Sequence, residues 1–177
     1  MLPLRLTALA AALALAANPL AAAPKSATPK GNIVAAAMSS PNHKTLVTAV
    51  KAAGLVDTLA GKGPFTLFAP TDAAFAKLPA GTVDTLLKPE NKGQLTAVLT
   101  YHVVPGRLTA ADIVAKIKAG GGRAALTTVQ GGTLTASLSG GKVVLTDAKG
   151  GTATVTTADL MQSNGIVHVT DAVSLPM

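Results

Sequence analysis

The stretch Phe65 to Pro79, Phe-Thr-Leu-Phe-Ala-Pro-Thr-Asp-Ala-Ala-Phe-Ala-Lys-Leu-Pro, organises the predicted fold. Its first five residues are apolar or favour β-structure, and Pro64 and Pro70 bound them, which predicts a short buried strand. Thr71 then stands at a helix N-cap position, and Asp72 brings a negative charge to the positive end of the helix dipole. A strand followed directly by a helix is therefore expected.

The expected helix has one apolar face, because Phe75 and Leu78 are three residues apart. This face can join the strand and the helix in one core. Nothing in the stretch is chemically reactive. We therefore interpret it as a structural motif, with the key residues Phe68, Pro70, Thr71, Asp72 and Phe75.

On both sides of this stretch the first half of the chain is typical of helices. Apolar residues recur at helical spacing, and asparagine, threonine, glycine or proline stands near most of the expected ends. The chain is predicted to become extended from Tyr101 to Val104. The expected helices cover residues 32–38, 42–53, 55–60, 71–78, 81–87, 91–100 and 109–118.

From residue 123 onward the sequence changes to short runs in which threonine and valine alternate, separated by glycine pairs or Asn-Gly. This pattern predicts antiparallel strands joined by tight turns. A helix-rich first half and a strand-rich second half together predict a single α+β domain. The expected strands are 125–129, 133–138, 142–146, 152–157 and 166–170.

Residues 1–23 have the features of a secretory signal peptide. Arg5 precedes an alanine- and leucine-rich run, and Ala21-Ala22-Ala23 suits signal peptidase. The run is short for a membrane span, although an uncleaved anchor stays open as the alternative. We expect a flexible leader over residues 24–31 and the domain over residues 32–177. The protein is then expected to be secreted or periplasmic, with association with the cell surface as an option.

Composition and charge restrict the function. The chain has no cysteine, which excludes disulfides and thiolate chemistry, and only 2% aromatic residues, which disfavours nucleic-acid stacking surfaces. Its net charge is +7; without Arg5, 14 basic residues face 8 acidic ones, a charge of about +6. Two loose basic groups, Lys88 with Lys92 and Lys116 with Lys118 and Arg123, are either a solvated surface or weak sites for anionic polymers or envelopes, an anionic polysaccharide among them.

No pattern predicts catalysis, a cofactor or a metal. No serine stands in a Gly-x-Ser-x-Gly elbow. The run Gly120 to Ala125 matches a dinucleotide fingerprint by count, but it follows a helix and precedes a strand, which is the reverse order. His43, His102 and His168 lack metal-ligand spacing. A hydrolase acting on envelope polymers is therefore the least favoured of three hypotheses.

Two histidines allow two interpretations. His168 lies in the run Ile166 to Thr170, and His102 follows the only tyrosine, Tyr101. Both can be core imidazoles with a ring nitrogen bonded to the backbone, because buried polar groups normally find partners. Alternatively, Tyr101 and His102 belong to a recognition site.

Four stretches together resemble the fasciclin domain: Thr66–Phe75, Leu99–Val104, Thr133–Thr135 and Asn164–Asp171. Their order and spacing agree with that family from about residue 32 to residue 176. The resemblance implies a wedge-shaped β-sandwich flanked by helices, in secreted or surface-held proteins associated with adhesion and extracellular matrix. It also places Asn164, Gly165 and His168 among the structural motif residues.

In animal relatives of that family, a Tyr-His motif and an Asp-Ile motif before the Asn-Gly are associated with integrin contact. Residue by residue, these motifs map to Tyr101-His102 and to Asp159-Leu160-Met161, where leucine replaces isoleucine. Of these we take four, Tyr101, His102, Asp159 and Leu160, as contacts. Thr157-Ala158 stand where the relatives carry Glu-Pro. The resemblance thus implies an adhesion or binding module without naming its receptor, and these four residues are the candidate contacts.

The preferred hypothesis is an exported, non-enzymatic adhesion or binding module that contacts a protein, a cell surface or a matrix component. The alternative is a periplasmic carrier or sensor for a small apolar ligand or an anionic glycan. A deep apolar cavity or a gathered basic groove would favour that alternative. No nucleic-acid partner, and no membrane span after signal removal, is expected.

Overall fold

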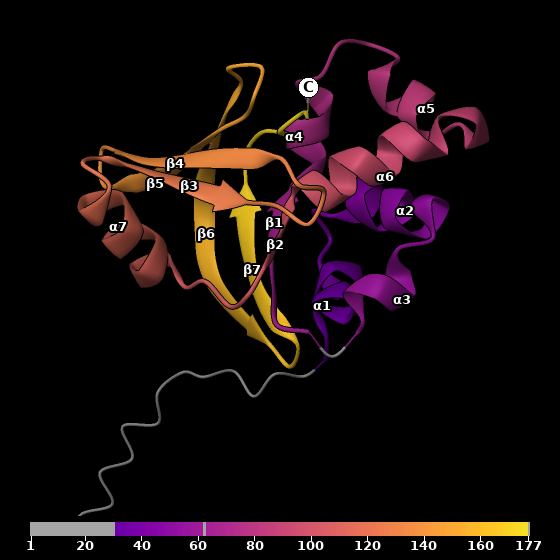
Figure 1. Cartoon of the computed structure of the whole chain (residues 1–177). Coiled ribbons are helices and arrows are strands. Elements are labelled where there is room, and N and C mark those ends of the chain that lie inside the picture. The colour runs from indigo at the N-terminus through magenta and orange to yellow at the C-terminus, as the bar shows by residue number, and fades with distance from the viewer. Residues whose placement is uncertain (1–30, 62, 177) are drawn as a thin grey trace, which may run out of the picture.

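The computed structural model describes residues 31–61 and 63–176. It places helices α1 to α6 on one side of a strongly curved sheet and α7 beside β3, β4 and β5 (Figure 1). The predicted signal peptide and all but the last residue of the predicted leader lie outside these residues. No helix in the described part of the chain has the length and apolar character needed to cross a membrane. The helices are α1 (Ile33–Ser39), α2 (Lys44–Ala53), α3 (Val56–Leu59), α4 (Asp72–Ala76), α5 (Thr82–Leu87), α6 (Lys92–Tyr101) and α7 (Ala110–Ala119), with a 3-10 turn η1 (Pro89–Asn91).

The seven strands form one sheet in the order β2-β1-β7-β6-β5-β4-β3. Neighbours are antiparallel except for β1 and β7, which are parallel. The strands are β1 (Phe65–Pro70), β2 (Val103–Pro105), β3 (Arg123–Thr127), β4 (Thr133–Ser139), β5 (Lys142–Thr146), β6 (Thr152–Gln162) and β7 (Gly165–Thr170). The predicted α+β class is confirmed, as are the antiparallel pairs of the second half.

The resemblance implied a β-sandwich, which has two separate sheets. The structure instead has one sheet that nearly closes on itself. The two strands at the ends of the order approach each other, because the Val129 N–H just after β3 donates to the Val103 carbonyl of β2 at 2.8 Å. The strand predicted at 125–129 is accordingly found two residues earlier, since Arg123 to Thr127 pair with β4 while Val129 turns to β2.

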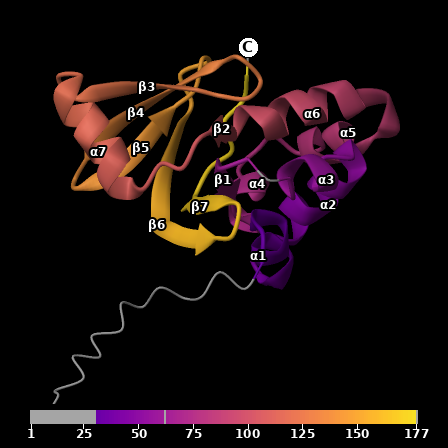
Figure 2. The same ribbon diagram turned by 60° about the horizontal axis from the view of Figure 1, so that its bottom comes forward.

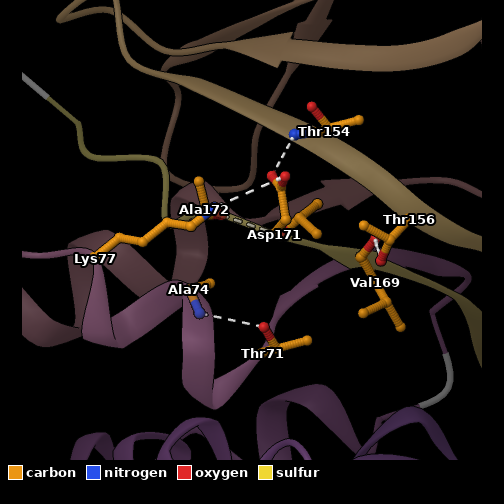
Figure 3. A network of polar contacts seen from close by, with 9 residues as sticks. Thr71, Ala74, Lys77, Thr154, Thr156, Val169, Asp171 and Ala172 are labelled. Atoms are coloured by element: carbon orange, nitrogen blue, oxygen red, sulfur yellow. Dashed lines mark hydrogen bonds and ion pairs between the residues drawn. The ribbon is translucent and has the colours of Figure 1, made fainter.

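Helix caps predicted from the sequence are present. The Thr71 hydroxyl accepts a hydrogen bond from the Ala74 N–H at 3.2 Å (Figure 3). The Asn32 side chain accepts from the third residue of α1, and Thr109 forms a capping box with Asp112 at the start of α7. These caps satisfy backbone donors that a helix start leaves without partners. They explain why α1, α4 and α7 begin where they do.

The structure corrects the prediction that the chain becomes extended at Tyr101. Tyr101 is the last residue of α6, and the His102 N–H donates to the Leu99 carbonyl at 3.1 Å, so β2 begins only at Val103. Tyrosine and valine favour strands locally, but burial of the Tyr101 ring in the core overrides that preference. Strand β6 is also longer than predicted, because pairing with β7 resumes at Leu160 after two irregularities.

Two hydrophobic cores lie on opposite faces of β1 and β7. The elements that cover them, helices α1 to α6 and the group of β3, β4, β5 and α7, lie on opposite sides of these strands (Figure 2). The first core lies under helices α1 to α6 and includes Leu67. The second lies under β3, β4, β5 and α7 and includes Phe68. Neighbouring residues of a strand point to opposite faces, so β1 contributes to both cores at once.

The end of β7 is tied to α4 and β6 through one carboxylate (Figure 3). Asp171 accepts a hydrogen bond from the Thr154 N–H at 2.8 Å and lies 3.8 Å from the Lys77 ammonium. The ion pair is exposed, so its contribution to stability is small. The backbone contact is the one that orients the carboxylate.

Candidate functional site

Tyr101, the first candidate contact residue, is almost completely buried, with 1% of its surface exposed. Its hydroxyl donates to the Thr133 carbonyl at 2.8 Å and accepts from the Ala148 N–H at 3.1 Å. A Cβ on Gly132 would come within 2.6 Å of the ring, so the β3–β4 turn lies directly against it. Burial raises the pKa of Tyr101, which keeps the phenol protonated.

His102 is equally enclosed, with 2% exposure. Its Nδ1–H donates to the Val98 carbonyl at 2.7 Å, and its Nε2 accepts from the Ser174 N–H at 3.0 Å. These partners require the neutral ring, in agreement with the pKa of His102, which burial lowers against the opposing effects of the Val98 carbonyl and Asp147. The side chain thereby joins the end of α6 to the C-terminal segment.

Asp159 lies at the irregularity of β6 and makes two anchoring hydrogen bonds. Its carboxylate accepts from the Ala110 N–H at the start of α7 at 2.7 Å, and its own N–H donates to His168 Nδ1 at 3.3 Å. Its φ of 59° is the left-handed conformation that aspartate adopts more readily than most residues. These contacts hold a bend of β6 in one geometry.

His168 is completely buried and supports that bend from β7. Its Nε2–H donates to the Leu108 carbonyl at 2.8 Å, and its ring stacks on Phe68 with centroids 5.5 Å apart. Burial lowers the pKa of His168 more strongly than the Leu108 carbonyl and Asp159 raise it. The interpretation of His102 and His168 as core imidazoles therefore accounts for all four of their ring nitrogens.

The two residues after Asp159 are the exposed part of the predicted motif. Leu160 and Met161 are each 39% exposed although both are large and apolar. Leu160 lines a groove of about 210 Å³ between the end of α1, β6 and β7, together with Thr71 and Val169. The sequence interpretation mapped the motif onto Asp159-Leu160-Met161 and counted Leu160, but not Met161, among the candidate contacts.

His43, at the start of α2, lines the same groove and was also missed as a site residue. Only 6% of it is exposed. Its Nδ1 lies 2.7 Å from the Ser40 hydroxyl, whereas Nε2 has no hydrogen-bond partner among the described residues. Burial lowers its pKa, against weaker opposing effects of the Ala69 carbonyl and Asp72. The sequence could not identify His43 as a groove residue, because the groove is built from four separate elements.

The remaining structural motif residues connect distant parts of the chain. The Asn164 side chain accepts from the Ile33 N–H at 2.9 Å and donates to the Leu59 carbonyl at 2.6 Å. The Asp72 carboxylate accepts from the Thr45 N–H in the first turn of α2 at 2.8 Å, which lowers its pKa although burial opposes this. A Cβ on Gly165 would overlap the Phe65 carbonyl, so only glycine fits between β1 and β7. Phe68, Pro70 and Phe75 are buried in or beside the cores.

The four candidate contact residues are not gathered into one site. No hydrogen bond in the described part of the chain joins Tyr101 or His102 to Asp159 or Leu160. Across residues 31–61 and 63–176, no three histidine, aspartate or glutamate side chains lie close enough to hold a metal ion. The contact roles assigned to the four residues stay predictions.

A family model for the fasciclin domain matches residues 41–176. The chain belongs to the fasciclin domain family. This fasciclin protein is 46% identical over 144 residues to the uncharacterized protein sll1735 of Synechocystis, covering 81% of this chain and 97% of that one. It is 36% identical over 166 residues to immunogenic protein MPB70 of Mycobacterium bovis, covering 91% and 77%.

The match to an animal protein covers a smaller share of both chains. The fasciclin chain is 34% identical over 131 residues to transforming growth factor-beta-induced protein ig-h3 of Sus scrofa, covering 74% of this chain and 17% of that one. Among solved structures, a pair of FAS1 domains from the insect cell adhesion molecule Fasciclin I matches with a TM-score of 0.72 and 21% identity. This match covers 82% of this chain and 51% of that one, and it shows the fold alone.

Proposed function

We propose that this fasciclin domain acts outside the cytoplasm as a non-enzymatic module that attaches to a cell surface or matrix by protein contact. The segment from Asp159 to Met161 is the proposed contact. The observation that carries the proposal is the exposure of Leu160 and Met161 on a bend that Asp159 and His168 hold in place.

The chemistry of this segment suits protein recognition. Leu160 is a large exposed apolar side chain beside a groove, and Met161, the next residue of β6, exposes a second one on the other face of the strand. Exposed apolar surface next to a groove is typical of protein-binding sites. A bend anchored on both α7 and β7 loses little conformational freedom when it binds. Leu160 projects at the edge of the groove, so a partner side chain could pack against it and enter the hollow.

The relatives support an extracellular attachment role without identifying the partner. Fasciclin domains are known from adhesion-related extracellular proteins. One relative is a cell surface glycolipoprotein of Mycobacterium bovis, MPB83, and the matched structure comes from an insect cell adhesion molecule. None of these names specifies what the present chain contacts.

The test is retention of cells or native envelope fragments on immobilised protein, with heat-denatured protein as the baseline. We expect the double variant L160S/M161S to lose most of the retention with little change in thermal stability. The matched control is V129S/L138S, which removes two other exposed apolar side chains, 45% and 37% exposed in the native chain. Equal retention by the two variants would contradict the proposed contact.

A second candidate function is the binding of a small apolar ligand in the groove beside His43. The favouring observation is its lining: Ala69, Val167 and Val169 are apolar, while the His43 Nε2 has no partner in the described residues. Hexanol, which combines an apolar chain with one hydroxyl, is a suitable probe. Addition of hexanol should shift the ring resonances of His43 and leave those of His102 unchanged; unshifted His43 signals would exclude this function.

A further inference from the structure

The four strands β3 to β6 have one face that no other element covers in the described structure. Their inward residues pack in the second core with α7, and the alternate residues face solvent. Most of these outward residues carry a hydroxyl group. The outward residues are Arg123, Ala125 and Thr127 on β3, Thr133, Thr135, Ser137 and Ser139 on β4, Lys142, Val144 and Thr146 on β5, and Thr152, Thr154 and Thr156 on β6.

Strand pairing arranges these residues in rows across the face, which we call the threonine face. One row contains Arg123, Ser137, Val144 and Thr154, and the next contains Ala125, Thr135, Thr146 and Thr152. Neighbouring strands are about 4.8 Å apart, and outward residues repeat about every 6.7 Å along a strand. The hydroxyls therefore form a regular two-dimensional array.

Several hydroxyls of the threonine face are available to a ligand. The Ser137 hydroxyl donates to the Val144 carbonyl at 3.4 Å. The hydroxyls of Thr135, Thr146 and Thr154 make no hydrogen bond with the described residues, although the Thr154 N–H donates to Asp171. Threonine is common in strands for conformational reasons alone. A face that serves only solubility usually carries charges of both signs, however, and no acidic residue lies among these outward positions.

Two exposed cations, Arg123 and Lys142, lie at one end of the threonine face, and a third, Lys118, lies beyond that end on α7, which packs against the opposite face of the sheet. Arg123 opens β3 and Lys142 opens β5, and both lie at the same end because β4 runs antiparallel between them. Lys118 is in the last turn of α7, and the tight turn that follows folds back toward Arg123. Lys116 is not counted, since Asp112 stands four residues earlier on α7, the spacing at which opposite charges on a helix attract each other.

These cations are not neutralised within the described residues. The ion pair that these residues form joins Lys77 to Asp171 and involves none of Lys118, Arg123 and Lys142. The sequence placed Lys118 and Arg123 in one loose group with Lys116, and the strand register adds Lys142. We refer to Lys118, Arg123 and Lys142 as the basic end.

We propose that the threonine face and the basic end together bind an acidic polysaccharide. The carboxylate or sulfate groups of the chain would lie on the basic end, where the Arg123 guanidinium can form paired hydrogen bonds to an oxyanion. Its hydroxyl groups would exchange hydrogen bonds with the threonine array. This contact is separate from the one proposed at Leu160 and does not depend on it.

Other partner classes fit this surface less well. Single-stranded nucleic acid is usually bound on aromatic side chains, and the outward positions contain none. Protein partners generally need a cluster of apolar anchors, whereas Val144 is the one large apolar residue among those positions. A flexible, hydrated and anionic sugar chain matches both the hydroxyls and the charge.

The experiment measures binding of polygalacturonate at low ionic strength by calorimetry, with neutral dextran as a control polymer. The variant K118Q/R123Q/K142Q removes the basic end. The matched control K44Q/K51Q/K92Q removes the same charge from α2 and α6, on the far side of the molecule (Figure 1). We expect binding to weaken about tenfold in the first variant and to change less than about twofold in the second.

A second pair of variants tests the hydroxyl array without changing charge. T135V/T146V keeps the β-branched shape on the threonine face, and T58V/T85V is the control on α3 and α5. We expect about a threefold loss only in the first. Absent wild-type binding, or equal losses in the two triple variants, would overturn the proposal. The variant L160S/M161S should bind polygalacturonate normally, which separates this test from that of the attachment function.

Discussion

The Tyr101–His102 pair and the Asp159–Met161 segment were both candidates for recognition, and the fold treats them in opposite ways. The first pair is enclosed, and its polar atoms bond to Thr133, Ala148, Val98 and Ser174. The second segment lies on a bend and exposes Leu160 and Met161. The fold thus gives the first motif core contacts and leaves part of the second motif on the surface.

The buried pair and the bend also differ in what a substitution should do. In the enclosed pair a change removes packing and leaves buried polar atoms unpaired, so stability should fall. In the bend a change should affect binding more than stability. The expected loss in the free energy of unfolding is therefore largest at Tyr101 and smallest at the bend.

The largest effect is expected for Tyr101→Ala. Truncation of a buried aromatic side chain typically lowers the free energy of unfolding by about 3–5 kcal/mol, and the lost hydroxyl also leaves the Thr133 carbonyl unpaired. Denaturant unfolding measures this. An unchanged unfolding midpoint together with lost attachment would instead make Tyr101 a contact residue and remove the contrast between the two motifs.

The next largest loss of stability is expected for His102→Leu, and it should exceed the loss in His43→Leu. Replacement of His102 strands the Val98 carbonyl and the Ser174 N–H in the interior, and each unpaired group costs about 1–3 kcal/mol. His43 has one side-chain partner, Ser40, and one nitrogen without a partner, so its replacement should cost less. Equal losses of stability in the two variants would show that the ring hydrogen bonds of His102 do not account for its contribution to stability.

Stability should also depend on pH through these buried rings. The pKa values of His102 and His168 are lowered by burial from the ordinary 6.5, so the unfolded chain takes up protons more readily than the folded one. Stability is therefore full above pH 6.5 and declines as the pH falls below it, by about 1.4 kcal/mol for each pKa unit of lowering. Thermal melting across this range measures the decline, which should be shallower in His102→Leu.

The smallest effect is expected at the bend. Asp159→Gly removes the hydrogen bond to the Ala110 N–H but tolerates the φ of 59°, so a loss of about 1 kcal/mol is expected. Asp159→Ala should lose about 1 kcal/mol more, because alanine disfavours that conformation. Both should weaken attachment if the bend orients Leu160. Unaltered attachment in a folded Asp159→Ala protein would show that the bend need not be held.

Much of the fold could be predicted because it depends on neighbours in the sequence. The Thr71 and Thr109 caps, the left-handed Gly54 after α2 and the alternation of β4 and β5 all involve residues within a few positions. The end of α6 could not be predicted in this way. The conformation of Tyr101 is decided by contacts with Thr133 and Ala148, which lie far away in the chain.

The candidate site shows the same division. Asp159 and Leu160 could be named from the sequence, but their roles differ because one bonds to α7 and the other faces a groove. His43 and Lys142 had no signal of their own. The groove around His43 and the basic end around Lys142 arise only when separate strands and helices come together.

The sequence alone therefore determined the elements, their caps, the α+β class and the family. Only the tertiary structure decided the parallel pairing of β1 with β7, the burial of the Tyr101–His102 pair and the surfaces left for partners. The physical reason is range. Capping and alternation act over a few residues, whereas burial depends on which distant segments cover a side chain, as when Asn164 binds the backbone of Ile33.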